Sequence, residues 1–246
     1  MPPIFRKILM VLSPFCLGVA GGIWAQAFLL PYLAWTAPFE DWKFIQQWNS
    51  RTTIIREVQE IVVTEAQALE RTIERVQKVS VRVQSTKGKT ILEGSGFIVT
   101  SDGLILTLAD LVPEGFRAQV ELEGEEKPRE ALVLKRDGKR NLALLKIEEG
   151  NLPTTSFADA LPIKLGTGVF LVGKTKDNGS LATVVNQGIV KSQSPNTITT
   201  TIFEEPFFNG SPLFNREGRV LGLTTIDKEG RVAATPFSLL RSFAGF

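Results

Sequence analysis

The sequence contains no histidine among its 246 residues, and its only cysteine is Cys16. Without an imidazole, the chain has no histidine to act as a general base for a nucleophile. A single thiol cannot form an intrachain disulfide, and the lack of histidine and further cysteine argues against a zinc site. The sequence therefore predicts neither a bound metal nor a cofactor.

An excess of charge of either sign is also missing. The chain has 28 lysines and arginines against 26 aspartates and glutamates, a formal net charge of +2. This balance gives no indication of nucleic acid or of a strongly acidic partner. The length predicts one domain of roughly 150–200 residues with accessory parts, which is long enough to bury a core.

The N-terminal region has no charge between Ile8 and Phe39, and Arg6 and Lys7 precede this run. About 20 apolar residues span a bilayer, so the run predicts a transmembrane helix over residues 8–30 within an anchor region of residues 1–38. The positive-inside rule places the N-terminus in the cytoplasm and the remaining chain outside the cytoplasmic membrane. The lipid bilayer is thus one expected partner.

Two other interpretations of this region stay open. Ala25-Gln26-Ala27 resembles a signal-peptide cleavage site, although the apolar run continues through Phe28, Leu29 and Leu30 and is long for such a peptide. Cys16 suggests a lipoprotein, but Ser13-Pro14-Phe15 is a poor sequence to precede a lipidated cysteine. A buried apolar role for Cys16 is favoured.

Residues 39–63 are expected to form an extended juxtamembrane segment, because Thr52–Val63 is rich in β-branched residues. This segment serves as a stalk or contacts a neighbouring chain. Thr64 to Gln67 has the pattern of a capping box, and apolar residues then follow at helical spacing. A short amphipathic helix is therefore expected to open a domain of residues 64–246.

The domain itself has the pattern of an all-β protein. The stretch Gly94–Val112 contains two apolar runs around Asp102-Gly103, which predicts a hairpin. Short β-rich runs with turn signals between them recur along the rest of the chain, as in a barrel or sandwich. Examples of these runs are Val79–Gln84, Arg117–Glu123, Asn141–Ile147, Gly168–Gly173, Ala182–Ser192, Asn196–Phe203 and Arg219–Ile226, and a terminal helix is expected over Pro236–Phe243.

Four segments, in order, resemble the trypsin-like domain of the HtrA (Deg) family of serine proteases. They are Gly94–Val112, Arg140–Ile147, Thr183–Val190 and the nucleophile-like loop Pro206–Asn215 with the strand Gly218–Leu223 after it. The resemblance extends from about Leu69 to Phe246. It implies a mainly β, two-barrel chymotrypsin-like fold.

The resemblance also implies a catalytic triad, and this chain has a different residue at each of the three positions. Asp110 occupies the histidine position, Asn141 the aspartate position and Asn209 the serine position. Phe207 replaces the glycine that lends a backbone N–H to the oxyanion hole, while Gly210 is retained. The domain is therefore expected to be catalytically inactive.

Two sets of residues could in principle supply substitute chemistry. Ser211 is the fallback nucleophile, with Lys174 or Lys191 as its base. Sliding the loop to put Ser211 at the serine position disrupts the match over Pro212–Asn215 and restores no histidine. A carboxyl pair of Asp110 with Glu204 or Glu205 would require a shared proton. Solvated loop charges are the favoured interpretation of both glutamates.

The leading hypothesis is a membrane-anchored, inactive domain that binds an extended peptide by strand addition at the former substrate cleft, or that acts as a scaffold. Phe207, Phe208 and Phe203 are candidates to line that cleft beside Gly210; equally, they fill space vacated by the triad. The alternative is a divergent endopeptidase with a non-standard site. A homo-oligomer also stays open, since the family often trimerises through N-terminal segments. The family's C-terminal PDZ domains have no room after Phe246.

Overall fold

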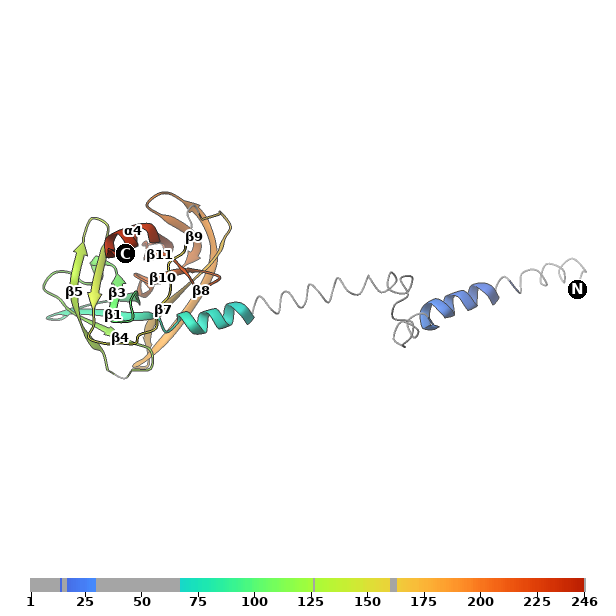
Figure 1. Cartoon of the computed structure of the whole chain (residues 1–246), viewed down its shortest axis with the longest axis horizontal. Coiled ribbons are helices and arrows are strands. Elements are labelled where there is room, and N and C mark those ends of the chain that lie inside the picture. The colour runs from blue at the N-terminus through green and yellow to red at the C-terminus, as the bar shows by residue number, and fades with distance from the viewer. Residues whose placement is uncertain (1–13, 15–16, 30–66, 126, 160–162, 246) are drawn as a thin grey trace, which may run out of the picture. The chain divides into compact units, whose positions relative to one another are not determined.

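A computed structural model describes residues 14, 17–29, 67–125, 127–159 and 163–245 (Figure 1). The chain divides into two units, Met1–Glu65 and Ala66–Phe246. In the first unit, a helix over residues 17–24 continues into the π-helix η1 (Ala25–Leu29). No helix among the described residues has both the length and the apolar character needed to cross a bilayer.

Several predictions for the N-terminal part fall on residues that the structure does not describe. These are most of the anchor region 1–38, the whole juxtamembrane segment 39–63 and the expected helix start at Thr64. The transmembrane helix, the stalk and the capping box therefore stay predictions.

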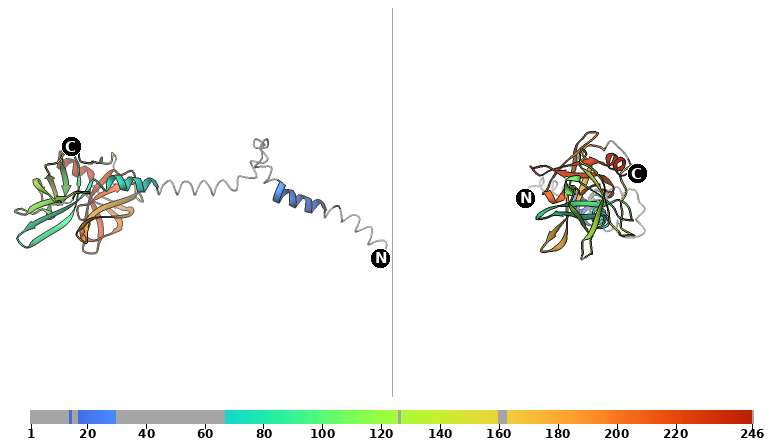
Figure 2. Two further views of the ribbon diagram at one scale, coloured as in Figure 1. Left: turned by 90° about the horizontal axis from the view of Figure 1, so that it is seen from below. Right: turned by 90° about the vertical axis from the view of Figure 1, so that its left-hand side faces the viewer.

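The second unit consists of two closed barrels, each built from six strands of the described chain (Figures 1 and 2). The strand order is β1-β2-β3-β6-β5-β4 in the first barrel and β10-β11-β12-β9-β8-β7 in the second. The expected mainly β, two-barrel architecture is confirmed. The strands are β1 (Ser80–Lys87), β2 (Thr90–Ile98), β3 (Leu104–Thr107), β4 (Arg117–Glu121), β5 (Arg129–Asp137), β6 (Leu142–Lys146), β7 (Gly168–Asp177), β8 (Ser180–Gln193), β9 (Ile198–Phe203), β10 (Pro212–Asn215), β11 (Val220–Ile226) and β12 (Arg231–Pro236).

The first barrel contains the predicted hairpin. β2 and β3 pair antiparallel with Phe97 opposite Leu106, and the connection includes Gly103 at φ 99°. Alternate side chains of a strand point to opposite faces, so Phe97 and Leu106 share one face of the hairpin, Ile98 and Ile105 share the other, and all four side chains are buried. Each such side chain, when fully buried, contributes roughly 1.5–3 kcal/mol of hydrophobic stabilisation.

The second barrel begins with the long hairpin of β7 and β8. Asn178 and Gly179 connect the strands with φ values of 49° and 85°, as a type I′ turn requires. β7 pairs with β8 from Gly168 opposite Ile189 to Asp177 opposite Ser180. β9, by contrast, joins β8 only between Val190 and Gln193, and the register shifts within that short stretch. The ladder around β9 is therefore irregular.

Two helices pack against the barrels. The helix over residues 67–76 buries Val76, with Leu69 and Ile73 partly buried beside it, as the helical spacing predicts. The predicted terminal helix is α4 (Phe237–Ala244). Although α4 follows the second barrel in sequence, its Phe243 joins the core of the first, where Lys135 Nζ on β5 donates to the Phe243 carbonyl at 2.7 Å.

The barrels are linked by an ion pair between Lys174 on β7, whose side chain is buried, and Glu123 after β4, which is partly accessible to solvent. Lys174 Nζ lies 2.8 Å from Glu123 Oε2 and 2.6 Å from Thr183 Oγ1, and the lysine side chain is fully buried. Desolvation by burial lowers the pKa of Lys174, while the Glu123 carboxylate acts in the opposite direction. This pair links the second barrel to the β4–β5 connection.

Glu123→Gln is expected to leave the buried Lys174 ammonium without an opposite charge, so that only neutral oxygen acceptors, the new amide and Thr183 Oγ1, face it. The pKa of Lys174 then falls further, and the unfolded state binds more protons than the folded state. The free energy of unfolding should drop by roughly 2 kcal/mol at pH 7, and this loss should shrink as the pH rises toward 10 and the lysine becomes neutral. Urea denaturation at pH 7 and pH 9.5 measures both.

The control is Glu148→Gln, because Glu148 is exposed and makes no side-chain contact with the described residues. Its substitution should change the free energy of unfolding by less than about 0.5 kcal/mol. An equal loss for Glu123→Gln at both pH values would contradict a role for the lysine charge.

Candidate functional site

Asp110 and Asn141, which occupy two of the triad positions, are brought together in the first barrel. Asp110 lies in the short 3-10 helix η2 (Ala109–Leu111) after β3, and Asn141 precedes β6 at φ 54°. The backbone N–H of Asp110 donates to Asn141 Oδ1 at 2.9 Å. The exposed Asp110 carboxylate has no hydrogen-bond partner in the described part of the chain. The contact therefore fixes the backbone and does not orient a base.

Asn209, at the nucleophile position, follows the 3-10 helix η3 (Pro206–Phe208). Its side-chain Oδ1 accepts a hydrogen bond from the Ile226 N–H at 2.8 Å, at the end of β11. Its carbonyl oxygen accepts from the Ser95 N–H at 2.8 Å, on β2 of the first barrel. Asn209 thus joins β2 to β11 across the two barrels, and its amide is engaged by the backbone.

The η3 turn also engages, in a hydrogen bond of its own, a backbone N–H that an oxyanion hole would need. In a serine protease, the N–H of the nucleophile residue points at the developing oxyanion. Here the Asn209 N–H donates to the Pro206 carbonyl at 2.9 Å, and the Phe208 N–H donates to Glu205 at 3.1 Å. Donors stabilise a transition state only when they face the position of its charge. In this conformation the Asn209 N–H does not face the position where an oxyanion would form.

Ser211, the fallback nucleophile, is fully buried, and its Oγ has no hydrogen-bond partner among the described residues. Neither Lys174 nor Lys191 therefore lies within hydrogen-bond reach of it. Lys174 instead contacts Thr183 and Glu123, as described above. The structure does not form the Ser–Lys pair that was considered from the sequence.

The two glutamates before Pro206 do not pair with Asp110 in the described residues. Glu204 Oε1 accepts from Asn186 Nδ2 at 2.6 Å, and the Glu204 N–H donates to the Gly230 carbonyl at 2.8 Å. Glu204 therefore lies between β8 and the turn that precedes β12. A carboxyl dyad, which requires two acids sharing one proton, is not formed.

The aromatic residues differ in accessibility. Phe208 is fully buried and stacks on the half-buried Phe207, with ring centroids 4.5 Å apart. Phe203 on β9 is 63 % exposed. Gly210 is buried at φ 83°, and its N–H donates to Thr224 at 2.9 Å. Phe208 and Gly210 are both buried, which for Phe208 favours the alternative that it fills space vacated by the triad; the binding role of these residues stays a prediction.

Ser95 is a residue whose role sequence reasoning missed. Its Oγ donates to the Phe207 carbonyl at 3.1 Å and accepts from the Lys174 N–H at 3.2 Å. Its own carbonyl accepts from Thr107 Oγ1 at 2.8 Å. Ser95 therefore holds η3 against both barrels. Its place between two glycines, Gly94 and Gly96, was the available signal, since glycines permit close backbone approach.

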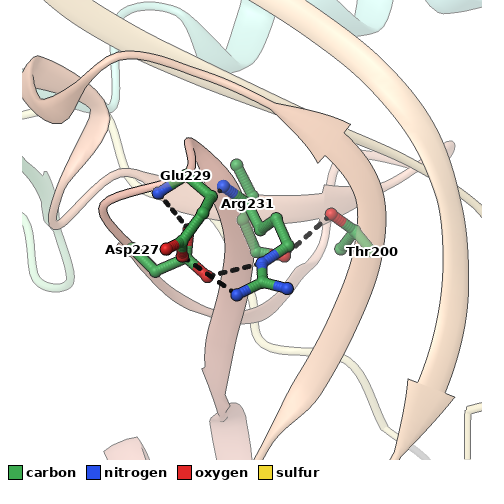
Figure 3. Close-up of polar contacts among 5 residues, drawn as sticks. Thr200, Asp227, Glu229 and Arg231 are labelled. Carbon is green, nitrogen blue, oxygen red and sulfur yellow. Dashed lines mark hydrogen bonds and ion pairs between the residues drawn. The ribbon is translucent and has the colours of Figure 1, made fainter.

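A pocket of about 600 Å³ is lined by residues of the second barrel, among them Ile226, whose N–H donates to Asn209. Asp227 and Arg231 line it, with Arg231 Nε 2.7 Å from Asp227 Oδ2 and Arg231 Nη2 3.0 Å from Glu229 Oε2 (Figure 3). Although desolvation opposes it, the ion pair with Arg231 lowers the pKa of Asp227. The other lining residues are Lys191, Ser192, Thr199, Thr200, Thr225, Val232 and Ala233.

Comparison with known proteins identifies the same fold. The profile of the trypsin-like peptidase domain family matches residues 94–223. The serine endoprotease from Yersinia pestis, a solved structure, matches with a TM-score of 0.65 and 25 % identity over 72 % of this chain and 65 % of that one. The fold is therefore chymotrypsin-like, as the resemblance implied.

Two proteins described as probable periplasmic serine endoproteases, DegP-like, are similar in sequence. The one from Chlamydia pneumoniae is 30 % identical over 58 % of this chain, and the one from Pseudomonas putida strain F1 is 32 % identical over 54 %. The chain spans 30 % and 28 % of the lengths of these two relatives. With more than half of its residues within the family profile, the chain belongs to the trypsin-like peptidase domain family.

Proposed function

We propose that this chain is a family member without hydrolytic activity that binds an extended peptide or protein segment. The observation that carries the proposal is the bonding of Asn209, whose amide oxygen and backbone N–H are both engaged by the protein's own backbone. An amide is not a nucleophile at neutral pH, and the residue here has a structural role. The fold is kept while the chemical groups are replaced.

The proposal is consistent with what acyl transfer to a hydroxyl requires. A base must take the proton of the hydroxyl, and preorganised donors must face the oxyanion. The chain contains no histidine, and the Asn209 N–H is directed into the η3 turn. Neither the base nor the oxyanion donor is in place, and the two are lost for separate reasons. Restoring one of them alone would therefore not restore hydrolysis.

Peptide binding is supported by the chymotrypsin-like fold and by the pocket next to Asn209. Extended peptides bind such surfaces by adding a strand, with pockets that receive alternate side chains. The pocket is lined by Thr225, Ile226 and Asp227 at the end of β11, where the backbone of Ile226 contacts Asn209. A peptide bound in this pocket would lie near the former nucleophile position without being cleaved.

The proposed site of action is the outer side of the cytoplasmic membrane. The charge-free run from Ile8, preceded by Arg6 and Lys7, supports an anchor with the N-terminus in the cytoplasm. The relatives that carry the description "periplasmic" are consistent with this placement. The proposal combines the anchor with a binding domain whose partner is an extracytoplasmic peptide or protein.

Incubation of the purified full chain with fluorescently labelled casein is expected to release no fluorescence above the buffer blank, while trypsin added as a positive control does. The Ser211→Ala variant should behave as the parent chain, because Ser211 has no base within reach. Release of labelled peptide by the parent that is lost in Ser211→Ala and kept in Ser242→Ala, a change at an exposed residue of α4, would overturn the proposal. Circular dichroism of both variants shows whether a loss of activity reflects unfolding.

A further inference from the structure

The pocket that Lys191 and Arg231 line lies where the strand ladder around β9 is interrupted. The register shifts between Val190 and Ser192 in the β8–β9 pair, and between Arg231 and Ala233 in the β9–β12 pair. β-Bulges of this kind bend a strand, and they re-aim side chains next to functional sites. Both irregularities border the same pocket.

Threonine hydroxyls replace the missing ladder bonds at this point. Thr200 Oγ1 donates to the Val232 carbonyl at 3.0 Å (Figure 3), and it accepts from the Ile202 N–H at 3.1 Å. Thr201 Oγ1 accepts from the Ile189 N–H at 3.1 Å. These side-chain hydrogen bonds satisfy backbone groups where the strands do not pair regularly. The irregular region beside the pocket is therefore held in place by the protein's own residues.

The charges in the pocket are arranged so that one cation stays available. The Arg231 guanidinium is held by Asp227 and Glu229 from the same turn (Figure 3). Lys191, at the end of β8, is exposed and makes no ion pair with any described residue. Beside it, the hydroxyls of Ser192 and Thr199 lie 2.5 Å apart. An ammonium with neighbouring hydroxyl groups is suited to a carboxylate.

Apolar side chains continue the exposed face of the sheet away from Lys191. Ile189 and Lys191 are both exposed while Val190 between them is buried, so both residues lie on the exposed side of β8. Ile189 is 44 % exposed, and Phe203 on the neighbouring strand β9 is 63 % exposed. A ligand with a carboxylate at Lys191 would thus meet apolar surface next to it.

We propose that this pocket binds a carboxylate of an extended peptide, with Lys191 Nζ as its counter-ion and with apolar peptide residues against Ile189 and Phe203. The inference rests on the proposed peptide-binding function, and it names the chemical group that the peptide presents. The carboxylate comes from a free peptide C-terminus or from an aspartate or glutamate side chain. Either source satisfies the same site.

The test uses fluorescence anisotropy of the full chain with three labelled decapeptides of alternating valine and threonine. One ends in a free carboxylate, one is amidated, and one is amidated with a glutamate replacing a central threonine. The amidated neutral peptide should bind about five- to tenfold more weakly than at least one of the other two, and the tighter form identifies the source of the carboxylate. Lys191→Ala should remove this difference, and Lys89→Ala, an exposed lysine between β1 and β2, should preserve it.

Equal affinity of all three peptides, or the same affinities in Lys191→Ala as in the parent, would overturn the carboxylate site while peptide binding itself stands. If none of the peptides binds, peptide binding fails in this test, and titration with sodium acetate tests the pocket separately. Saturable amide NMR shifts at Thr199 and Ala233 that disappear in Lys191→Ala would support the site. Absence of such shifts would overturn it.

Discussion

Replacing Gly210 by alanine is expected to lower the free energy of unfolding by about 4 kcal/mol. Gly210 has φ 83°, a conformation that costs an L-residue roughly 1–2 kcal/mol. A Cβ at this position would also overlap the Ser95 carbonyl and lie 3.0 Å from Thr107 Oγ1. Overpacking of a well-packed site typically costs a further 1–3 kcal/mol. The carbonyl belongs to β2 in the first barrel, so the backbone of both barrels must move.

The measurement is urea denaturation of the variant and of the parent, followed by circular dichroism. Gly150→Ala is the matched control, because Gly150 is exposed, has no positive φ, and has no atom within 4 Å of the position where its Cβ would lie. That change should leave the free energy of unfolding unaltered or raise it by less than about 1 kcal/mol. A loss below about 1 kcal/mol for Gly210→Ala would show that η3 tolerates a different backbone path.

Replacing Phe208 by alanine is expected to cost about 3–5 kcal/mol of unfolding free energy, the usual range for a buried phenylalanine. Phe208 has no exposed surface and stacks on Phe207. Its ring lies where a Cβ of residue 173 would otherwise stand, so Gly173 supplies no side chain to fill the vacated space. The cavity therefore persists, and the cost should be close to the upper limit of that range.

The control for this change is Phe203→Ala, which removes the same side chain from a position that is 63 % exposed. Its free energy of unfolding should stay within about 0.5 kcal/mol of the parent. Thermal and urea unfolding of the two variants test the difference. If both variants lost the same stability, Phe208 would not act through burial. A selective loss for Phe208→Ala would support the interpretation that it fills space left by the triad.

The strands that the sequence predicts are those with buried, β-branched faces, and the ones it misses lack such a face. In β5, most side chains are exposed, and the register shifts between Val133 and Lys135. In β12, the apolar positions include Ala233 and Ala234, which have little β-propensity. β10 begins with Pro212 and was interpreted as part of a loop. These three segments become strands because they pair with neighbouring strands in the closed barrels, and their local sequence does not predict it.

For the candidate site, the sequence predicts which residues replace the triad but not what they contact. The contact of Asp110 with Asn141 joins positions 31 residues apart, and that of Lys174 with Glu123 joins positions 51 apart. The carbonyl of Asn209 meets the Ser95 N–H from the other barrel. Such pairs depend on how the barrels pack, so no local sequence pattern predicts them. The accessible pocket at Lys191 arises from two bulges and likewise requires the fold.

The position of α4 bears on the order in which the chain acquires its structure during synthesis. All six strands of the first barrel precede β7, yet the apolar cluster that contains that barrel's core also contains Leu240 and Phe243 from α4, together with residues of β7, β10 and β11. The Phe243 carbonyl bonds Lys135 across 108 residues of sequence. A ribosome that has released only the first barrel therefore leaves part of its core exposed. We expect a chain truncated before Phe237 to be prone to aggregation, and complete folding to wait for the final residues.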